Sequence, residues 1–200
     1  MSLIKSLSFT IIFALILSFS NKVDCAKASD KPKPFEEFYP ESGYKSIESA
    51  AIEFENNFKR LLKLPLRVPP ISFTHYFGRF QHTNDGMNDC FILDALNDKV
   101  PKNHYKIIIR PIDQKWDIKG RNILGTYKLK NGKTATLIEF GRIKDPRRKN
   151  ENFGFNALFF EREGWQYEIS IDLRVVDIVT PEVLVNIANS IDYPAERPLE

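Results

Sequence analysis

The residues best able to do chemistry in this sequence are Cys90 and three histidines. A thiol at Cys90 could act as a nucleophile if a histidine accepted its proton and a third residue oriented the imidazole ring. The histidines are His75, His82 and His104. The same side chains could also ligate zinc, which needs three or four converging nitrogen, oxygen or sulfur ligands. Both uses depend on how the fold places these four residues.

The spacing of these residues favours neither use. His75 and His82 differ by seven positions, so on a straight strand they point to opposite faces unless the chain bends at Gly78. Cys90 precedes the apolar run 91–93, and burial among such residues raises the pKa of a thiol. No serine-nucleophile elbow or phosphate-binding glycine loop is found. We therefore predict no catalytic residue, metal ligand or cofactor, with an envelope enzyme using Cys90 and a histidine as the alternative.

A cluster of basic residues is the most distinctive candidate for binding. It lies between two expected strands and is interrupted by Asp145 and Pro146. Its members are Arg142, Lys144, Arg147, Arg148 and Lys149. Such a loop could bind anionic lipid headgroups or anionic wall polymers. The alternative is a solvated connection whose charges keep an exposed loop soluble.

A second candidate surface follows from the strand expected near residues 155–160. Both faces of this strand are apolar, so we expect both to be covered. A helix would cover one face, and a loop, ligand or partner would cover the other.

Two tight hairpins are predicted from turn residues. Asn131-Gly132 separates the expected strand segments 124–130 and 133–140, and both residues tolerate the positive φ of a two-residue turn. Glu163-Gly164 separates 153–162 from 165–173 in the same way. Further strands are expected at 71–80, 90–96 and 105–110.

Amphipathic helices are expected at both ends of this strand-rich region. Apolar residues recur at helical spacing from Ser46 to Leu64, with Ser46 as the N-cap and Pro65 as the stop. Thr180-Pro181 begins a second helix in the preferred order of cap and proline. We therefore predict an α+β fold: an antiparallel sheet of about five to six strands built from hairpins, with both helices packed on one face.

The first 28 residues have the features of a secretory signal peptide. Lys5 precedes an apolar run over residues 7–19, which is too short to cross a bilayer as a helix. Ala26 and Ala28 supply the small residues that signal peptidase requires, which places the cut before Ser29. A lipidated Cys25 is the alternative.

The remaining chain divides into three expected parts. Residues 29–43 form a charged, proline-rich flexible lead, residues 44–193 a single α+β domain, and residues 194–200 a tail. Removing the signal region lowers the formal charge from +3 to near +1. This charge argues against a nucleic-acid partner, and no integral membrane span remains after cleavage.

The second half of the chain resembles a known family. The residues that carry the resemblance are the Asn131-Gly132-Lys133 turn, the strand segment 158–160, Gly164-Trp165-Gln166-Tyr167, and the helical phrase 187–191. They are similar to an uncharacterised exported domain of Gram-positive lipoproteins and anti-sigma-factor ectodomains. The resemblance implies an exported, non-catalytic accessory or sensing domain, and it assigns no functional residues.

The sequence therefore predicts a secreted accessory or binding protein of the cell envelope. Its expected partner is an envelope protein or an anionic polymer, contacted through the sheet and the basic loop. A membrane-tethered lipoprotein sensor is the alternative if Cys25 is lipidated.

Overall fold

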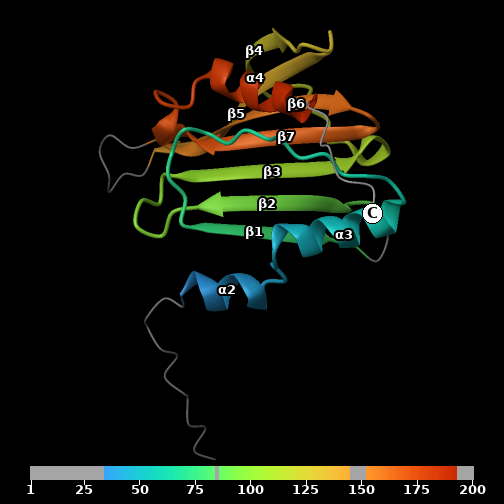
Figure 1. Cartoon of the computed structure of the whole chain (residues 1–200). Coiled ribbons are helices and arrows are strands. Elements are labelled where there is room, and N and C mark those ends of the chain that lie inside the picture. Colours follow the sequence, from blue (N-terminus) through green and yellow to red (C-terminus); the bar gives the residue numbers. More distant parts are fainter. Residues whose placement is uncertain (1–33, 84–85, 145–151, 193–200) are drawn as a thin grey trace, which may run out of the picture. The chain divides into compact units, whose positions relative to one another are not determined.

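The computed structural model describes residues 34–83, 86–144 and 152–192 (Figure 1). The expected signal peptide, the tail 194–200 and the turn residues 84–85 lie outside these residues. The described residues belong to one compact unit that begins at Pro34. Among them, no helix combines the length and apolarity needed to span a membrane.

The centre of the fold is one antiparallel sheet with the strand order β1-β2-β3-β7-β6-β5-β4 (Figure 1). The strands are β1 His75–Gln81, β2 Cys90–Leu96, β3 His104–Pro111, β4 Asn122–Lys128, β5 Thr134–Lys144, β6 Asn152–Arg162 and β7 Trp165–Asp172. The predicted α+β class and antiparallel sheet are confirmed, but the expected number of five to six strands is wrong because the described residues form seven. Every residue of β2 is buried, so this strand lacks the alternation that identifies a half-exposed strand.

Both predicted hairpins are present. Gly132 has a φ of +79° in the turn between β4 and β5, and the Oδ1 atom of Asn131 accepts a hydrogen bond from the backbone N–H of Lys133. Glu163 and Gly164 both have positive φ in the turn between β6 and β7. Positive φ at both Glu163 and Gly164 matches the right-handed twist of the paired strands, whereas in the β4–β5 turn only Gly132 has positive φ.

The connection from β3 to β4 is long because these strands are not neighbours. β3 pairs with β7, whereas β4 lies at the far edge of the sheet beyond β6 and β5. Residues 112–121, which begin with the short 3₁₀ helix η1 Ile112–Gln114, must therefore cross three strands. We call this segment the crossing loop.

Three α-helices accompany the sheet in the part of the chain that the structure describes. α3 Ile47–Phe58 begins as predicted at Ser46, whose hydroxyl accepts a hydrogen bond from the backbone N–H of Ser49 at 3.1 Å. It ends before the predicted Leu64, because Lys59 adopts a left-handed conformation. α4 Pro181–Asn189 begins after Thr180 as predicted.

The helix α2 Phe35–Glu41 was not expected, because it lies within the predicted flexible lead 29–43. Glu36 and Glu37 occupy its first turn, where negative charge stabilises the helix dipole. The Tyr39 ring stacks on Phe77 of β1 with 4.3 Å between ring centroids. The proline-rich composition of this segment does not predict a helix. The helix packs on the sheet through Phe77, which lies far along the chain.

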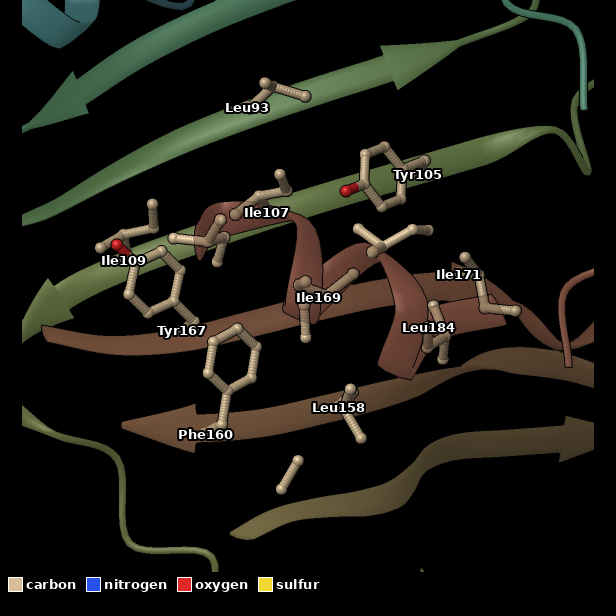
Figure 2. Close-up of a cluster of buried hydrophobic side chains, with 14 of the residues drawn as sticks. Leu93, Tyr105, Ile107, Ile109, Leu158, Phe160, Tyr167, Ile169, Ile171 and Leu184 are labelled. Atoms are coloured by element: carbon tan, nitrogen blue, oxygen red, sulfur yellow. The ribbon is translucent and has the colours of Figure 1, made fainter. Parts of the chain in front are cut away.

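The main core contains alternate residues of the strands together with residues of α3 and α4 (Figure 2). Figure 2 shows Leu184 of α4 on the same side as Ile169, Ile171 and Leu158. Gly78 lets α3 lie close to β1, since a Cβ there would be only 2.7 Å from the Cα of Ile47. We call the strand residues in this core the first face of the sheet and the alternate residues the second face.

Candidate functional site

The second face carries the crossing loop. A smaller core cluster there contains Ile138, Ala157 and Phe159, with Ile118 and Phe140 packed against it. Residue 118 belongs to the crossing loop, so this loop covers part of the second face of β5 and β6. The prediction that the 155–160 strand is covered on both faces holds for residues 157–160, which are buried, but not for Phe155, which is 37% exposed. The crossing loop provides part of the cover.

Gln166 of β7 fixes the position of the crossing loop. Its Oε1 atom accepts a hydrogen bond from the backbone N–H of Trp116 at 2.7 Å, and its Nε2 atom donates to the Trp116 carbonyl oxygen at 3.0 Å. Gln166 is buried, so these two bonds satisfy an amide that burial would otherwise destabilise. Lys115 also pairs with Glu161 of β6 at 3.0 Å.

The Trp116 side chain forms an aromatic surface over β5 and β6. Its ring centroid lies 5.6 Å from that of Phe140 and 6.4 Å from that of Phe159. The guanidinium groups of Arg110 and Arg121 lie 5.5 and 5.4 Å from the Trp116 ring. Despite these contacts, Trp116 remains 43% exposed. A large aromatic side chain with this exposure is typical of binding surfaces.

A groove of about 550 Å³ lies beside Trp116. It is lined by Lys115, Trp116, Asp117, Ile118, Lys119, Lys133, Thr134, Thr136, Phe159, Phe160, Glu161 and Gln166. This volume is within the range of small-molecule sites, and the mixture of aromatic, hydroxyl and charged groups is also typical of them. We call it the Trp116 groove.

The charges of the groove are distributed unevenly. Glu161 is paired with Lys115, and Asp117 accepts a hydrogen bond from the backbone N–H of Lys119 at 2.9 Å. Neither Lys119 nor Lys133 forms an ion pair with another described residue. Two ammonium groups are therefore available at an open site, where they favour an anionic ligand.

A polar cluster lies on the second face at the β2 end of the sheet. Asp94 is 1% exposed and accepts hydrogen bonds from Tyr44 at 2.7 Å and from His104 at 2.8 Å, with Lys106 at 3.4 Å. Burial opposes ionisation of Asp94, but these partners hold the pKa of its carboxyl below its usual value. This cluster links the segment after α2 to β2 and β3.

Glu168 of β7 has the opposite electrostatic behaviour. Burial raises the pKa of its carboxyl, although the positive charges of Arg110 and Lys106 act against this. The Nη2 atom of Arg110 lies 3.7 Å from Glu168, and the guanidinium of Arg110 also approaches Trp116. Arg110 therefore connects the buried carboxyl to the Trp116 groove.

Cys90 lies beside a small cavity whose lining contains no histidine. It is buried, and burial raises the pKa of its thiol. A cavity of about 90 Å³ beside it is lined by Gln81, Asn88, Asp89, Cys90, Arg110 and Gln114, a set without histidine. The arrangement does not activate a thiol, because a nucleophilic cysteine needs an adjacent base or a lowered pKa.

Each histidine instead pairs with its own carboxylate. His75 lies 2.9 Å from Glu36, His82 lies 2.9 Å from Asp89, and His104 binds Asp94. Across the described part of the chain, no group of three or more histidine, cysteine, aspartate or glutamate residues could hold a metal ion.

The structure describes only part of the predicted basic loop. The backbones of Arg142 and Lys144 belong to the end of β5, where an irregularity in the pairing with β6 follows Phe140. Arg147, Arg148 and Lys149 lie outside the described residues.

Sequence reasoning missed the Trp116 groove because residues 116–121 carry no periodic pattern and indicate only a connection between strands. The available signal was a tryptophan with lysines on both sides, in a segment that joins two strands without a turn motif. Comparison of the chain with protein-family models, with curated proteins and with solved structures finds no match.

Proposed function

We propose that this protein is an exported, non-catalytic accessory protein of the cell envelope that binds an anionic envelope polymer. The observation that carries the proposal is the Trp116 groove, where an exposed aromatic ring lies beside Lys119 and Lys133. In this proposal α3 and α4 both cover the first face, and the second face contacts the ligand. The amino-terminal features of a signal peptide support export, and the resemblance to exported accessory domains supports a binding role.

An anionic polymer suits this groove better than a protein partner does. The groove is open and contains cationic and hydroxyl groups at its rim, which can contact successive charged units of a chain. A protein interface would instead be expected to have a larger apolar centre.

The first experiment tests export. The protein is recovered separately from medium, wall and membrane fractions, and its intact mass and N-terminal residue are determined. A chain that begins at Ser29 in the medium or wall supports the proposal. A lipidated Cys25 in the membrane fraction would favour the tethered sensor.

The second experiment tests binding. The exported chain is sedimented with isolated envelope material at increasing salt concentration. We expect Lys119→Ser/Lys133→Ser to weaken binding, whereas the control Lys99→Ser/Lys102→Ser, which changes two exposed lysines outside the groove, leaves it unchanged. Binding that is insensitive to salt and to the groove variant contradicts the proposal. Loss of binding only in Arg147→Ser/Arg148→Ser/Lys149→Ser assigns the contact to the basic loop.

A further inference from the structure

We infer that the Trp116 groove binds a sugar unit carrying a phosphate group, with the sugar ring on Trp116 and the phosphate between Lys119 and Lys133. This inference rests on the proposed function, because it specifies the anionic polymer that the same groove would recognise. Three features of the groove support it.

The first feature is the exposed aromatic surface. Phe140 and Phe159 support Trp116 from the sheet, while nearly half of the Trp116 side chain remains in solvent. A sugar ring presents apolar C–H groups on its face and hydroxyls around its edge. It can therefore bury the apolar surface of the indole while its hydroxyls remain hydrogen-bonded.

The second feature is the set of hydroxyl and carboxylate groups around this surface. Thr134 and Thr136 line the groove from β5, and Glu161 lines it from β6. Their side chains supply acceptors and, for the threonines, donors for sugar hydroxyls. A lipid tail or an apolar peptide would displace water from these groups without offering them hydrogen bonds, at a cost in affinity.

The third feature is the positive charge at the rim. Lys119 belongs to the crossing loop, Lys133 belongs to the turn between β4 and β5, and both line the groove. Arg121 adds a guanidinium group beside the indole. Lysine ammonium groups bind phosphate as point charges, and arginine matches its geometry, so the set favours phosphate over a neutral sugar hydroxyl.

The groove is formed before any ligand arrives. The two hydrogen bonds from Gln166 and the ion pair between Lys115 and Glu161 fix the loop that carries Trp116 and Lys119. A fixed loop loses little conformational freedom on binding, which raises affinity. Gln166 is therefore a positioning residue for this site.

Tryptophan fluorescence provides a direct test. The chain has two tryptophans, Trp116 in the groove and Trp165 in the core at 1% exposure. The exported full-length chain is titrated with phosphorylated dextran, carboxymethyl dextran, neutral dextran and polyphosphate. We expect phosphorylated dextran to change the emission of Trp116 and to bind about tenfold or more tightly than the other three probes.

Variants assign the effect to the groove. Trp116→Ala and Lys119→Ser/Lys133→Ser should each weaken binding of phosphorylated dextran about tenfold, measured by calorimetry, while Lys99→Ser/Lys102→Ser leaves it unchanged. The lysine variant keeps the test valid if loss of Trp116 disturbs the fold. Equal binding of carboxymethyl dextran or polyphosphate overturns the inference, as does wild-type affinity in the groove variants.

The two proposals can fail separately. A protein that binds envelope material in a manner that depends on Lys119 and Lys133, but does not distinguish the four probes, supports the proposed function and overturns the sugar phosphate assignment. If the exported protein does not bind isolated envelope material, the proposed function itself is contradicted.

Discussion

The side-chain amide of Gln166 forms two hydrogen bonds with the backbone of Trp116, one to its N–H and one to its carbonyl oxygen. The glutamine side chain thus offers Trp116 one acceptor and one donor, as the backbone of a paired strand would, although the two residues are 50 positions apart in sequence. Such a two-point attachment fixes both the position and the direction of the backbone that carries the indole. The exposed aromatic surface therefore depends on a residue that is itself buried.

Replacing Gln166 with leucine should detach the crossing loop. The N–H and carbonyl of Trp116 lose their hydrogen-bond partners, so we expect the free energy of unfolding to fall by about 1–3 kcal/mol. Trp116 emission should shift toward that of a solvent-exposed indole. This emission is measured on the folded variant in native buffer, before the urea unfolding experiment. The control Gln81→Leu changes a glutamine on β1 and should leave the emission unchanged. Equal emission shifts in both variants would remove the positioning role.

Cys90 should react slowly in the folded protein. Burial raises the pKa of its thiol, so the fraction of reactive thiolate near neutral pH is reduced and access is restricted. The rate of modification by a disulfide reagent is measured at pH 7 with and without urea. We expect much faster reaction in urea. Rapid reaction of the folded chain would instead favour the alternative of an envelope enzyme that uses Cys90.

Gly78→Ala should destabilise the contact between β1 and α3. The added Cβ would lie 2.7 Å from the Cα of Ile47 and 3.0 Å from the Cβ of Ala50, so the helix must move. We expect a loss of about 1–3 kcal/mol in the free energy of unfolding, measured by urea denaturation. Gly125→Ala is the matched control, because its nearest contact is the end of the Tyr127 side chain at 3.2 Å. Similar losses in both variants would show that strand propensity, rather than helix contact, determines the effect.

Asp94 should contribute stability that disappears in acid. Its pKa is lower in the folded chain than the unfolded value of about 3.9, so the contribution is fully present above that value. It is lost as the pH falls through the lowered folded pKa. We expect Asp94→Asn to reduce stability at pH 7 by about 1–3 kcal/mol and to flatten the acid dependence of urea unfolding. An unchanged pH profile would contradict the role assigned to the carboxylate.

Glu168 provides the comparison of opposite sign. Because burial raises its pKa in the folded state, its ionisation opposes folding as the pH rises from its unfolded value of about 4.3 toward the folded pKa. Glu168→Gln should remove this decrease in stability. The free energy of unfolding is measured by urea denaturation from about pH 3 to about pH 7, the range in which carboxyl groups titrate. A decrease that persists in the variant would have to arise from other carboxyl groups.

Local sequence rules predicted the elements that depend on neighbouring residues. Asn131-Gly132 and Glu163-Gly164 determine their turns through backbone conformation, and Ser46 caps α3 through a bond to a residue three positions away. The residues that interact are close in sequence, so composition and spacing predict these features.

The features missed from the sequence depend on distant pairing. β3 pairs with β7 through contacts such as Ile107 with Ile169, and no turn motif connects these strands. Without this strand order, nothing in residues 112–121 shows that the segment must cross the sheet. Similarly, α2 packs on the sheet through the contact between Tyr39 and Phe77. The proline-rich local composition does not predict this contact.

The crossing loop also determines when the groove can form during folding. Trp116 precedes every residue on which it rests: Phe140 in β5, Phe159 in β6 and Gln166 in β7. Because the chain is synthesised from its amino terminus, Trp116 and Lys119 are made before the strands β5, β6 and β7 that position them. The groove is complete only when β7 lies between β3 and β6, so ligand recognition requires segments from both halves of the chain to be in place.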